Sequence, residues 1–235
     1  MTLREYILDL LFPPRCPFCG RVMRHSAICP DCEKAVSRTD PLPVRELTGG
    51  LRCAAPLWYE DSVREGLLRF KFQASRTAVG PLGELLAESA AEAFPGEFDT
   101  VTWVPVSKKR RKQRGFDQAE LLARAACRLW DTEPVPLLKK IVDNPAQSGL
   151  RDDSARRANV LGVYDPINED NIAGHRILLV DDICTTGATL QECARVLRDA
   201  GAEAVVCAAV AHAREKGRNS PACGGNTQEK RTKNP

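Results

Sequence analysis

The sequence predicts an α/β protein whose main domain is a mostly parallel sheet covered by helices on both faces. Short apolar strand patterns at 101–106, 176–180 and 204–210 alternate with helical patterns, and a further strand is expected at 135–142. Because parallel neighbours need a crossover connection, such alternation is typical of sheets covered on both sides. Ligands bind beyond the carboxyl ends of the strands in these sheets, so we expect the functional site at that edge.

Helical periodicity accounts for much of the chain between these strands. Apolar residues three and four apart predict helices at 62–72 and 81–94, and a third helix at 190–200 is ended by a glycine. Asp117 is a candidate N-cap, and Glu120 would complete a capping box. The helix that Asp117 begins is expected to bury Leu121, Leu122, Ala125, Leu129 and Trp130.

Composition divides the 235 residues into four regions. We expect a helix and a cysteine-rich unit at 1–40, a connector at 41–51, the large domain at 52–212 and a disordered tail at 213–235. Hydrophobic residues at 43% and charged residues at 28% are ordinary for a globular protein. The net charge of +3 identifies no partner by itself.

Membrane and exported proteins are not expected from this sequence. No stretch reaches the roughly 20 apolar residues that a membrane-spanning helix needs. Segment 1–12 is amphipathic, but it contains charges and lacks a small-residue cleavage site, so it is a poor signal peptide. We therefore expect a cytoplasmic protein.

The main functional prediction comes from the run Ile177-Leu-Leu-Val-Asp-Asp-Ile-Cys-Thr-Thr-Gly-Ala-Thr-Leu190. An apolar strand ends at two carboxylates, and a hydroxyl-rich loop then precedes a helix. Backbone N–H groups, hydroxyls and the helix dipole suit a phosphate in that loop, whereas the carboxylates suit ribose hydroxyls. One ribose 5-phosphate group explains both halves; the alternative is a turn in which the same side chains only cap the helix. The expected binding residues are Asp181, Asp182, Thr185, Thr186, Gly187, Ala188 and Thr189.

This run resembles the phosphoribosyl-pyrophosphate (PRPP) signature of type I phosphoribosyltransferases. The resemblance implies ribose contacts from the acid pair, 5-phosphate contacts from the loop, and Mg²⁺ bound with PRPP if the protein is active. Cys184 stands where a bulkier residue is expected, and we interpret it as a small side chain beside the loop rather than a reactive thiol. The sequence singles out no catalytic residue.

A basic segment follows the strand at 101–106. Lys108 to Arg114 contains six cations in seven residues. We expect a loop here that holds pyrophosphate or a nucleic-acid backbone; the alternative is a solvated basic loop. The candidate residues are Ser107, Lys108, Lys109, Arg110, Arg111 and Arg114.

The segment 139–159 is long for a connector between two strands, and long loops are often functional lids. The segment resembles type I phosphoribosyltransferases, which have a mobile loop at this position that covers the reacting centre. Gln147, Arg151 and Arg157 are the candidate site residues within it.

Two Cys-x-x-Cys pairs near the N-terminus predict a structural zinc site. Each pair directs two sulfurs toward one point, and two pairs complete a tetrahedron around Zn²⁺. A redox dithiol or unrelated thiols are the alternatives, and His25 is a rival ligand. The expected ligands are Cys16, Cys19, Cys29 and Cys32.

The combination of a zinc unit and a phosphoribosyltransferase motif is similar to the ComF family, which is linked to natural competence. Four further segments agree with this resemblance: Tyr59–Arg64, Leu68–Phe72, Arg114–Leu122 and Arg157–Asn159. It implies an α/β phosphoribosyltransferase fold preceded by a zinc-ribbon-like unit, and a role in DNA uptake with single-stranded DNA and a helicase-like protein as partners. Cys53 stands alone downstream, so a second metal site is not expected.

Three functions are compatible with these motifs. The first is a DNA-handling protein that binds PRPP or a ribose 5-phosphate group. The second is an active PRPP-dependent transferase in nucleotide salvage or related metabolism. The third is a regulator that senses PRPP.

Overall fold

The computed structural model describes residues 13, 15–23, 28–36, 38–39, 44–73, 78–143 and 160–214. The segment 1–12 and the tail beyond Arg214, for which a helix and disorder are expected, lie outside this range. The helices and strands are α2 (Pro30–Ala35), β1 (Val44–Leu47), β2 (Leu51–Ala54), β3 (Leu57–Trp58), α3 (Asp61–Gln73), α4 (Val79–Ala93), β4 (Thr100–Trp103), α5 (Lys108–Arg114), α6 (Gln118–Leu129), β5 (Leu138–Lys140), β6 (Tyr164–Pro166), the 3-10 helix η3 (Glu169–Asn171), β7 (Arg176–Cys184), α8 (Ala188–Asp199) and β8 (Ala204–His212).

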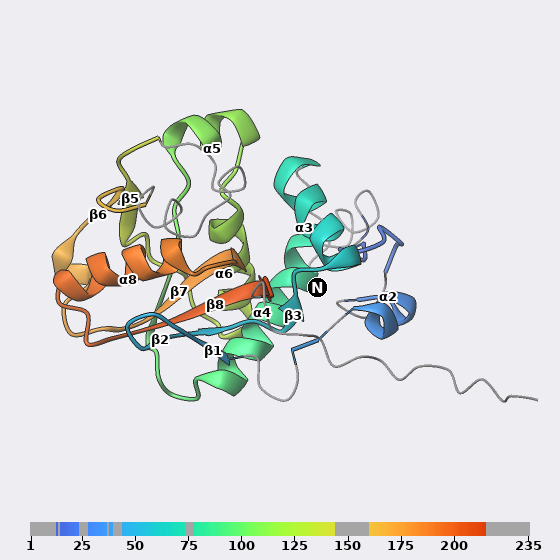
Figure 1. Ribbon diagram of the computed structural model, residues 1–235, viewed down its shortest axis with the longest axis horizontal. Coiled ribbons are helices and arrows are strands. Elements are labelled where there is room, and N and C mark those ends of the chain that lie inside the picture. Colours follow the sequence, from blue (N-terminus) through green and yellow to red (C-terminus); the bar gives the residue numbers. More distant parts are fainter. Residues whose placement is uncertain are drawn as a thin grey trace, which may run out of the picture.

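The main sheet has the strand order β1-β2-β8-β7-β4, and β3 also pairs with β8 (Figure 1). All pairings in it are parallel except that of β1 with β2. β7 and β8 are interior strands of this sheet. β8 is apolar from Ala204 to Ala211 and β7 from Ile177 to Val180, as strands buried on two faces usually are. The predicted parallel sheet is therefore confirmed.

Alternate residues of β7 enter two different hydrophobic cores. Leu178 and Val180 pack in the core that contains α4 and α6, whereas Ile177 and Leu179 pack in the core that contains α8. This alternation follows from the two-residue period of a strand. Figure 1 shows α8 on one face of the sheet and α4 with α6 on the other.

Two expectations about these elements are corrected by the structure. The segment expected as a strand at 135–142 leaves β4 after a hydrogen bond from Val135 N to Val101 O of 2.8 Å, and only Leu138–Lys140 is a strand. It pairs antiparallel with β6 in a separate two-stranded sheet. In α6, Leu122 and Ala125 are buried as expected, but Leu129 is 55% exposed because the last turn extends beyond the packed face.

A glycine permits the close contact between α4 and α6. A Cβ atom on Gly83 would collide with the Cβ atom of Ala125, well inside any permitted contact distance. The two helices therefore approach each other at this point because one of them lacks a side chain.

We expect Gly83→Ala to lower the free energy of unfolding by about 1–3 kcal/mol, because overpacking outweighs the gain in helix propensity. Gly80→Ala is the matched control: Gly80 lies on the same helix, is exposed, and a Cβ atom there would meet no neighbouring atom within 4 Å. Urea unfolding of both variants measures the difference. Equal stability of the two variants would contradict the tight α4–α6 contact.

Candidate functional site

A pocket of about 540 Å³ opens at the carboxyl end of β7, where a parallel sheet is expected to bind its ligand. Its walls combine two kinds of groups. Carboxylates come from the end of β7, and cations come from α3, α5 and β5. The lining includes Lys71, Arg110, Arg114, Lys140, Asp181, Asp182, Thr185, Gly187 and Thr189.

The hydroxyl-rich loop lies directly before α8, which begins at Ala188. Gly187 has a φ of 76°, a left-handed conformation that glycine adopts without strain. A Cβ there would also lie 2.7 Å from a methyl group of Leu47, so a side chain would displace the loop. The Oγ1 of Thr186 accepts a bond from Ala188 N at 3.4 Å.

The loop is held from the opposite side by strand β1. Arg45 Nη1 donates to the carbonyl oxygen of Thr185 at 3.0 Å and to that of Ala213 at 3.3 Å. These bonds anchor the loop carbonyl. The first turn of α8 can then present backbone N–H groups and the positive end of its dipole to an anion.

The acid pair lies within β7 and not beyond its end as expected, because β7 continues to pair with β8 as far as Cys184. Asp181 borders the pocket. Burial raises the pKa of Asp181 well above its ordinary value, and the neighbouring charge of Asp182 raises it further. This carboxyl group therefore gains from a ligand that brings hydrogen-bond donors or positive charge.

Asp182 is paired with a lysine that is not among the predicted site residues. Lys71 Nζ of α3 lies 2.8 Å from Oδ2 of Asp182. Burial by itself would lower the pKa of Lys71, but its attraction to Asp182 outweighs this effect, so the pKa lies above its ordinary value. The signal that could have identified Lys71 is its place in the segment Leu68–Phe72, which resembles the ComF family.

The basic segment forms helix α5, so the expectation of a loop is wrong. Ser107 caps the helix by accepting a bond from Arg110 N at 3.3 Å, and Gly115 ends it with a φ of 81°. The Ser107 hydroxyl also donates to Asp143 at 2.5 Å. Caps at both ends explain why a short segment without apolar periodicity is helical.

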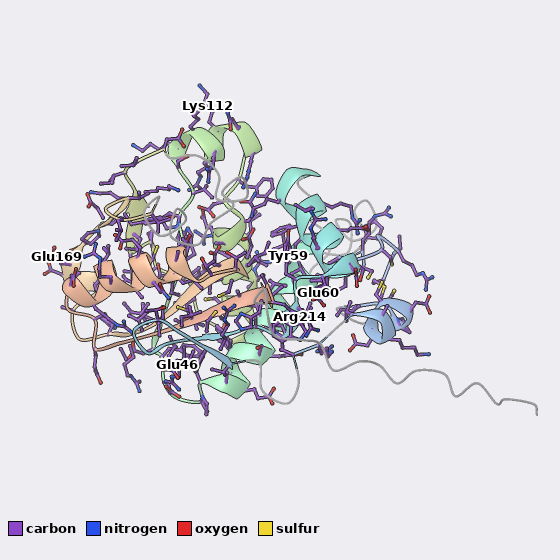
Figure 2. The ribbon with its side chains drawn as sticks, in the orientation of Figure 1. Glu46, Tyr59, Glu60, Lys112, Glu169 and Arg214 are labelled. Carbon is purple, nitrogen blue, oxygen red and sulfur yellow. The ribbon has the colours of Figure 1, made fainter. Side chains whose placement is uncertain are left out.

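Helix formation separates the cations of this segment into two groups. Arg110 and Arg114 line the pocket. Lys108, Lys109 and Lys112 are exposed, and Figure 2 shows the Lys112 side chain projecting away from the rest of the protein. Arg111 is exposed too, but it pairs with Glu120 at 3.1 Å.

Asp117 is the N-cap of α6, as predicted. Its Oδ1 accepts bonds from Ala119 N at 3.2 Å and Glu120 N at 3.4 Å, and its Oδ2 accepts a bond from Val106 N at 2.9 Å. Glu120 pairs with Arg111 and Arg124. Asp117 therefore joins the end of the β4 segment to the start of α6. The lid candidates Gln147, Arg151 and Arg157 lie outside the described residues.

The predicted zinc ligands converge on one point. The sulfur atoms of Cys16, Cys19, Cys29 and Cys32 all lie within 4.8 Å of one another, and a bond from Cys16 N to Arg21 O closes the first turn at 2.8 Å. Three are buried and Cys19 is exposed. This arrangement fits a structural Zn²⁺ site with four thiolate ligands, which requires no ligand from outside the protein.

The zinc unit packs against α3, the helix that carries Lys71. A Cβ on Gly66 would lie 2.6 Å from the Pro17 carbonyl oxygen, and Arg69 donates a hydrogen bond to the Phe18 carbonyl oxygen. The first cysteine turn therefore touches the backbone of α3.

Comparisons with known proteins agree with both parts of this arrangement. The Phosphoribosyl transferase domain family matches residues 112–229, and the Double zinc ribbon domain family matches residues 7–44. These matches show a phosphoribosyltransferase-type α/β fold and support structural zinc at the cysteine cluster. Among the described residues, no helix is long and apolar enough to cross a membrane.

Three curated relatives span most of the chain. Competence protein ComFC of Bacillus subtilis is 32% identical over 192 residues, which are 81% of this chain and 74% of that protein. Competence protein F of Haemophilus influenzae is 26% identical and covers 82% of each chain. DNA utilization protein YhgH of Escherichia coli K12 is 28% identical, covering 81% of this chain and 80% of that protein. The chain therefore belongs to the ComF family, in which a cysteine-rich zinc unit precedes a phosphoribosyltransferase-type domain.

Proposed function

We propose that this protein binds PRPP or another ribose 5-phosphate compound in the pocket at the end of β7 and that it acts on single-stranded DNA during DNA uptake. The observation that carries the proposal is one pocket that combines the hydroxyl-rich loop before α8, two carboxylates and several cations. The relatives are named for competence and DNA utilization, which supports the DNA part. As part of the same proposal, the protein acts in the cytoplasm and has a helicase-like partner.

The ligand is placed by charge. Its 5-phosphate occupies the loop before α8, where Thr185 to Thr189 supply hydroxyl and backbone donors. The ribose hydroxyls donate to Asp181 and Asp182. A pyrophosphate group then lies toward Arg110 and Arg114, which line the same pocket. The two carboxylates also supply the oxygen atoms that Mg²⁺ prefers, so Mg²⁺ carried by PRPP fits this edge.

The ion pair between Lys71 and Asp182 can open when a negatively charged ligand enters the pocket. In the ligand-free protein the half-buried Lys71 neutralises Asp182. When ribose hydroxyls bind to Asp182, Lys71 can instead contact a phosphate oxygen of the ligand. Lys71 is therefore a binding residue of the proposed site, together with Arg110 and Arg114.

Transferase activity is a second candidate function, favoured by the same mixture of cations and carboxylates. A nitrogen nucleophile would attack C1 of PRPP, the C1–O bond would break, and pyrophosphate would leave with the bonding electron pair. Arg110 and Arg114 would stabilise the negative charge on the leaving group. A PRPP sensor would use the pocket without this step.

Replacing Asp181 and Asp182 together by Asn should weaken PRPP binding at least tenfold, because hydrogen bonds to charged acceptors contribute about 1.5–3 kcal/mol each. Isothermal titration calorimetry with PRPP and Mg²⁺ measures the change. Asp199→Asn, at the far end of α8, is the control and should bind as the wild type does. Wild-type affinity in the double variant would exclude the acid pair as the ribose site.

If the protein is a transferase, PRPP should release pyrophosphate in the presence of one member of a panel of purine and pyrimidine bases. Release should disappear in the Asp181→Asn/Asp182→Asn variant. An enzyme-coupled pyrophosphate assay provides the measurement. PRPP binding without release across the whole panel would support a binding or sensing role.

The exposed cations of α5 should contribute to the binding of single-stranded DNA. We expect the triple variant Lys108→Ala, Lys109→Ala and Lys112→Ala to weaken binding of a labelled oligonucleotide in fluorescence anisotropy. It should also flatten the salt dependence by about 0.7 in log–log slope for each lost phosphate contact.

The matched control removes three exposed cations elsewhere, through Lys34→Ala, Arg128→Ala and Arg198→Ala. It changes the net charge equally and should alter the binding less. If both triple variants lose the same affinity, overall charge explains the binding and α5 is not the contact.

A further inference from the structure

A second cysteine–histidine cluster lies within the main sheet, away from the zinc unit. Cys53 of β2, Cys184 of β7 and His212 of β8 place their donor atoms within 4.8 Å of one another. All three are buried, with exposed fractions of 0%, 1% and 2%. Cys53 has no partner in any local sequence motif, because residues from distant parts of the chain form this cluster.

A hydrogen bond to the protein backbone fixes the tautomer of the His212 ring. Its Nε2 lies 3.2 Å from the carbonyl oxygen of Cys53, which can only accept, so Nε2 carries the proton. The Nδ1 of a neutral imidazole then carries the lone pair that coordination requires. A backbone carbonyl that fixes the tautomer in this way is the usual support of a metal-binding histidine.

The donor set selects the metal. Two sulfur atoms and one imidazole nitrogen are ligands of Zn²⁺, with Zn–S distances of about 2.3 Å and Zn–N distances of about 2.0–2.1 Å. Around a tetrahedral ion these lengths separate neighbouring donors by roughly 3.5–3.8 Å. Because the donor atoms already lie within 4.8 Å of one another, binding the ion requires only small side-chain movements.

We propose that Cys53, Cys184 and His212 form a second Zn²⁺ site, distinct from the four-cysteine site. Each ligand comes from a different strand, so the sheet itself positions them before metal arrives. Cys193 and Cys207 are equally buried cysteines outside this group of donors. Burial of a cysteine therefore does not by itself explain why two cysteines and a histidine meet here.

The second site adjoins the proposed ribose 5-phosphate pocket. Cys184 lines that pocket and directly precedes Thr185 of the loop. Its carbonyl oxygen accepts a bond from Ala213 N at 2.9 Å, next to the strand end that carries His212. Three protein ligands leave one coordination position, which a water molecule from the pocket can fill.

The zinc content of the purified full-length protein tests the proposal. After equilibration with Zn²⁺ and removal of the excess, inductively coupled plasma mass spectrometry should find two zinc ions per wild-type chain. Cys53→Ala and Cys184→Ala should each retain one, and so should the Cys16→Ser/Cys29→Ser variant. Cys193→Ala is the matched buried-cysteine control and should retain two.

His212→Gln serves if an alanine variant fails to fold, as judged by circular dichroism, and should also retain one zinc ion. Cobalt substitution gives an independent measurement, because Co²⁺ bound to sulfur absorbs in the near ultraviolet. The Cys16→Ser/Cys29→Ser variant should keep such a band, and adding Cys184→Ala should remove it. One zinc ion per wild-type chain, or two in every variant of the second cluster, would overturn the proposal.

Discussion

The pairing of β7 with β8 is the constraint on which the other features of this protein depend. The two strands are in register from Arg176 with Ala204 to Cys184 with His212. Their alternate side chains supply both hydrophobic cores, so neither strand can shift by one residue without exchanging the two faces. The same register places Asp181, Asp182 and the start of the hydroxyl-rich loop at one edge of the sheet.

This constraint has an electrostatic cost that shapes the pocket. Two adjacent carboxylates at the end of a buried strand disfavour each other's charge, and together with burial this raises the pKa of Asp181. Lys71, Arg110 and Arg114 surround them with positive charge. A compound with hydroxyls at one end and phosphates at the other satisfies both sets of groups at once. A purely anionic or purely cationic ligand would leave one set uncompensated.

Local features of the sequence were sufficient to predict the parts of the fold that depend on neighbouring residues. Strands β4, β7 and β8, the cap at Asp117 and the convergence of the two cysteine pairs follow from short patterns, whereas β1, β2 and β3 were not predicted. Helix α5 was missed because Lys108 to Arg114 has no apolar periodicity, and the caps at Ser107 and Gly115 determine its structure. The segment Leu68–Phe72 resembles the family and includes Lys71, but its pairing with Asp182 could not be predicted locally, since the two residues are more than a hundred positions apart in the sequence.

The same long-range contacts connect the zinc unit to the pocket. The first cysteine turn rests on α3 at Gly66, where a side chain would collide with Pro17. Five residues further along this helix, Lys71 reaches Asp182 in the sheet. The cysteine unit therefore contacts the helix α3, and α3 carries the lysine that pairs with Asp182 of the acid pair. A small unit that takes no part in lining the pocket can thus influence its charge through one helix.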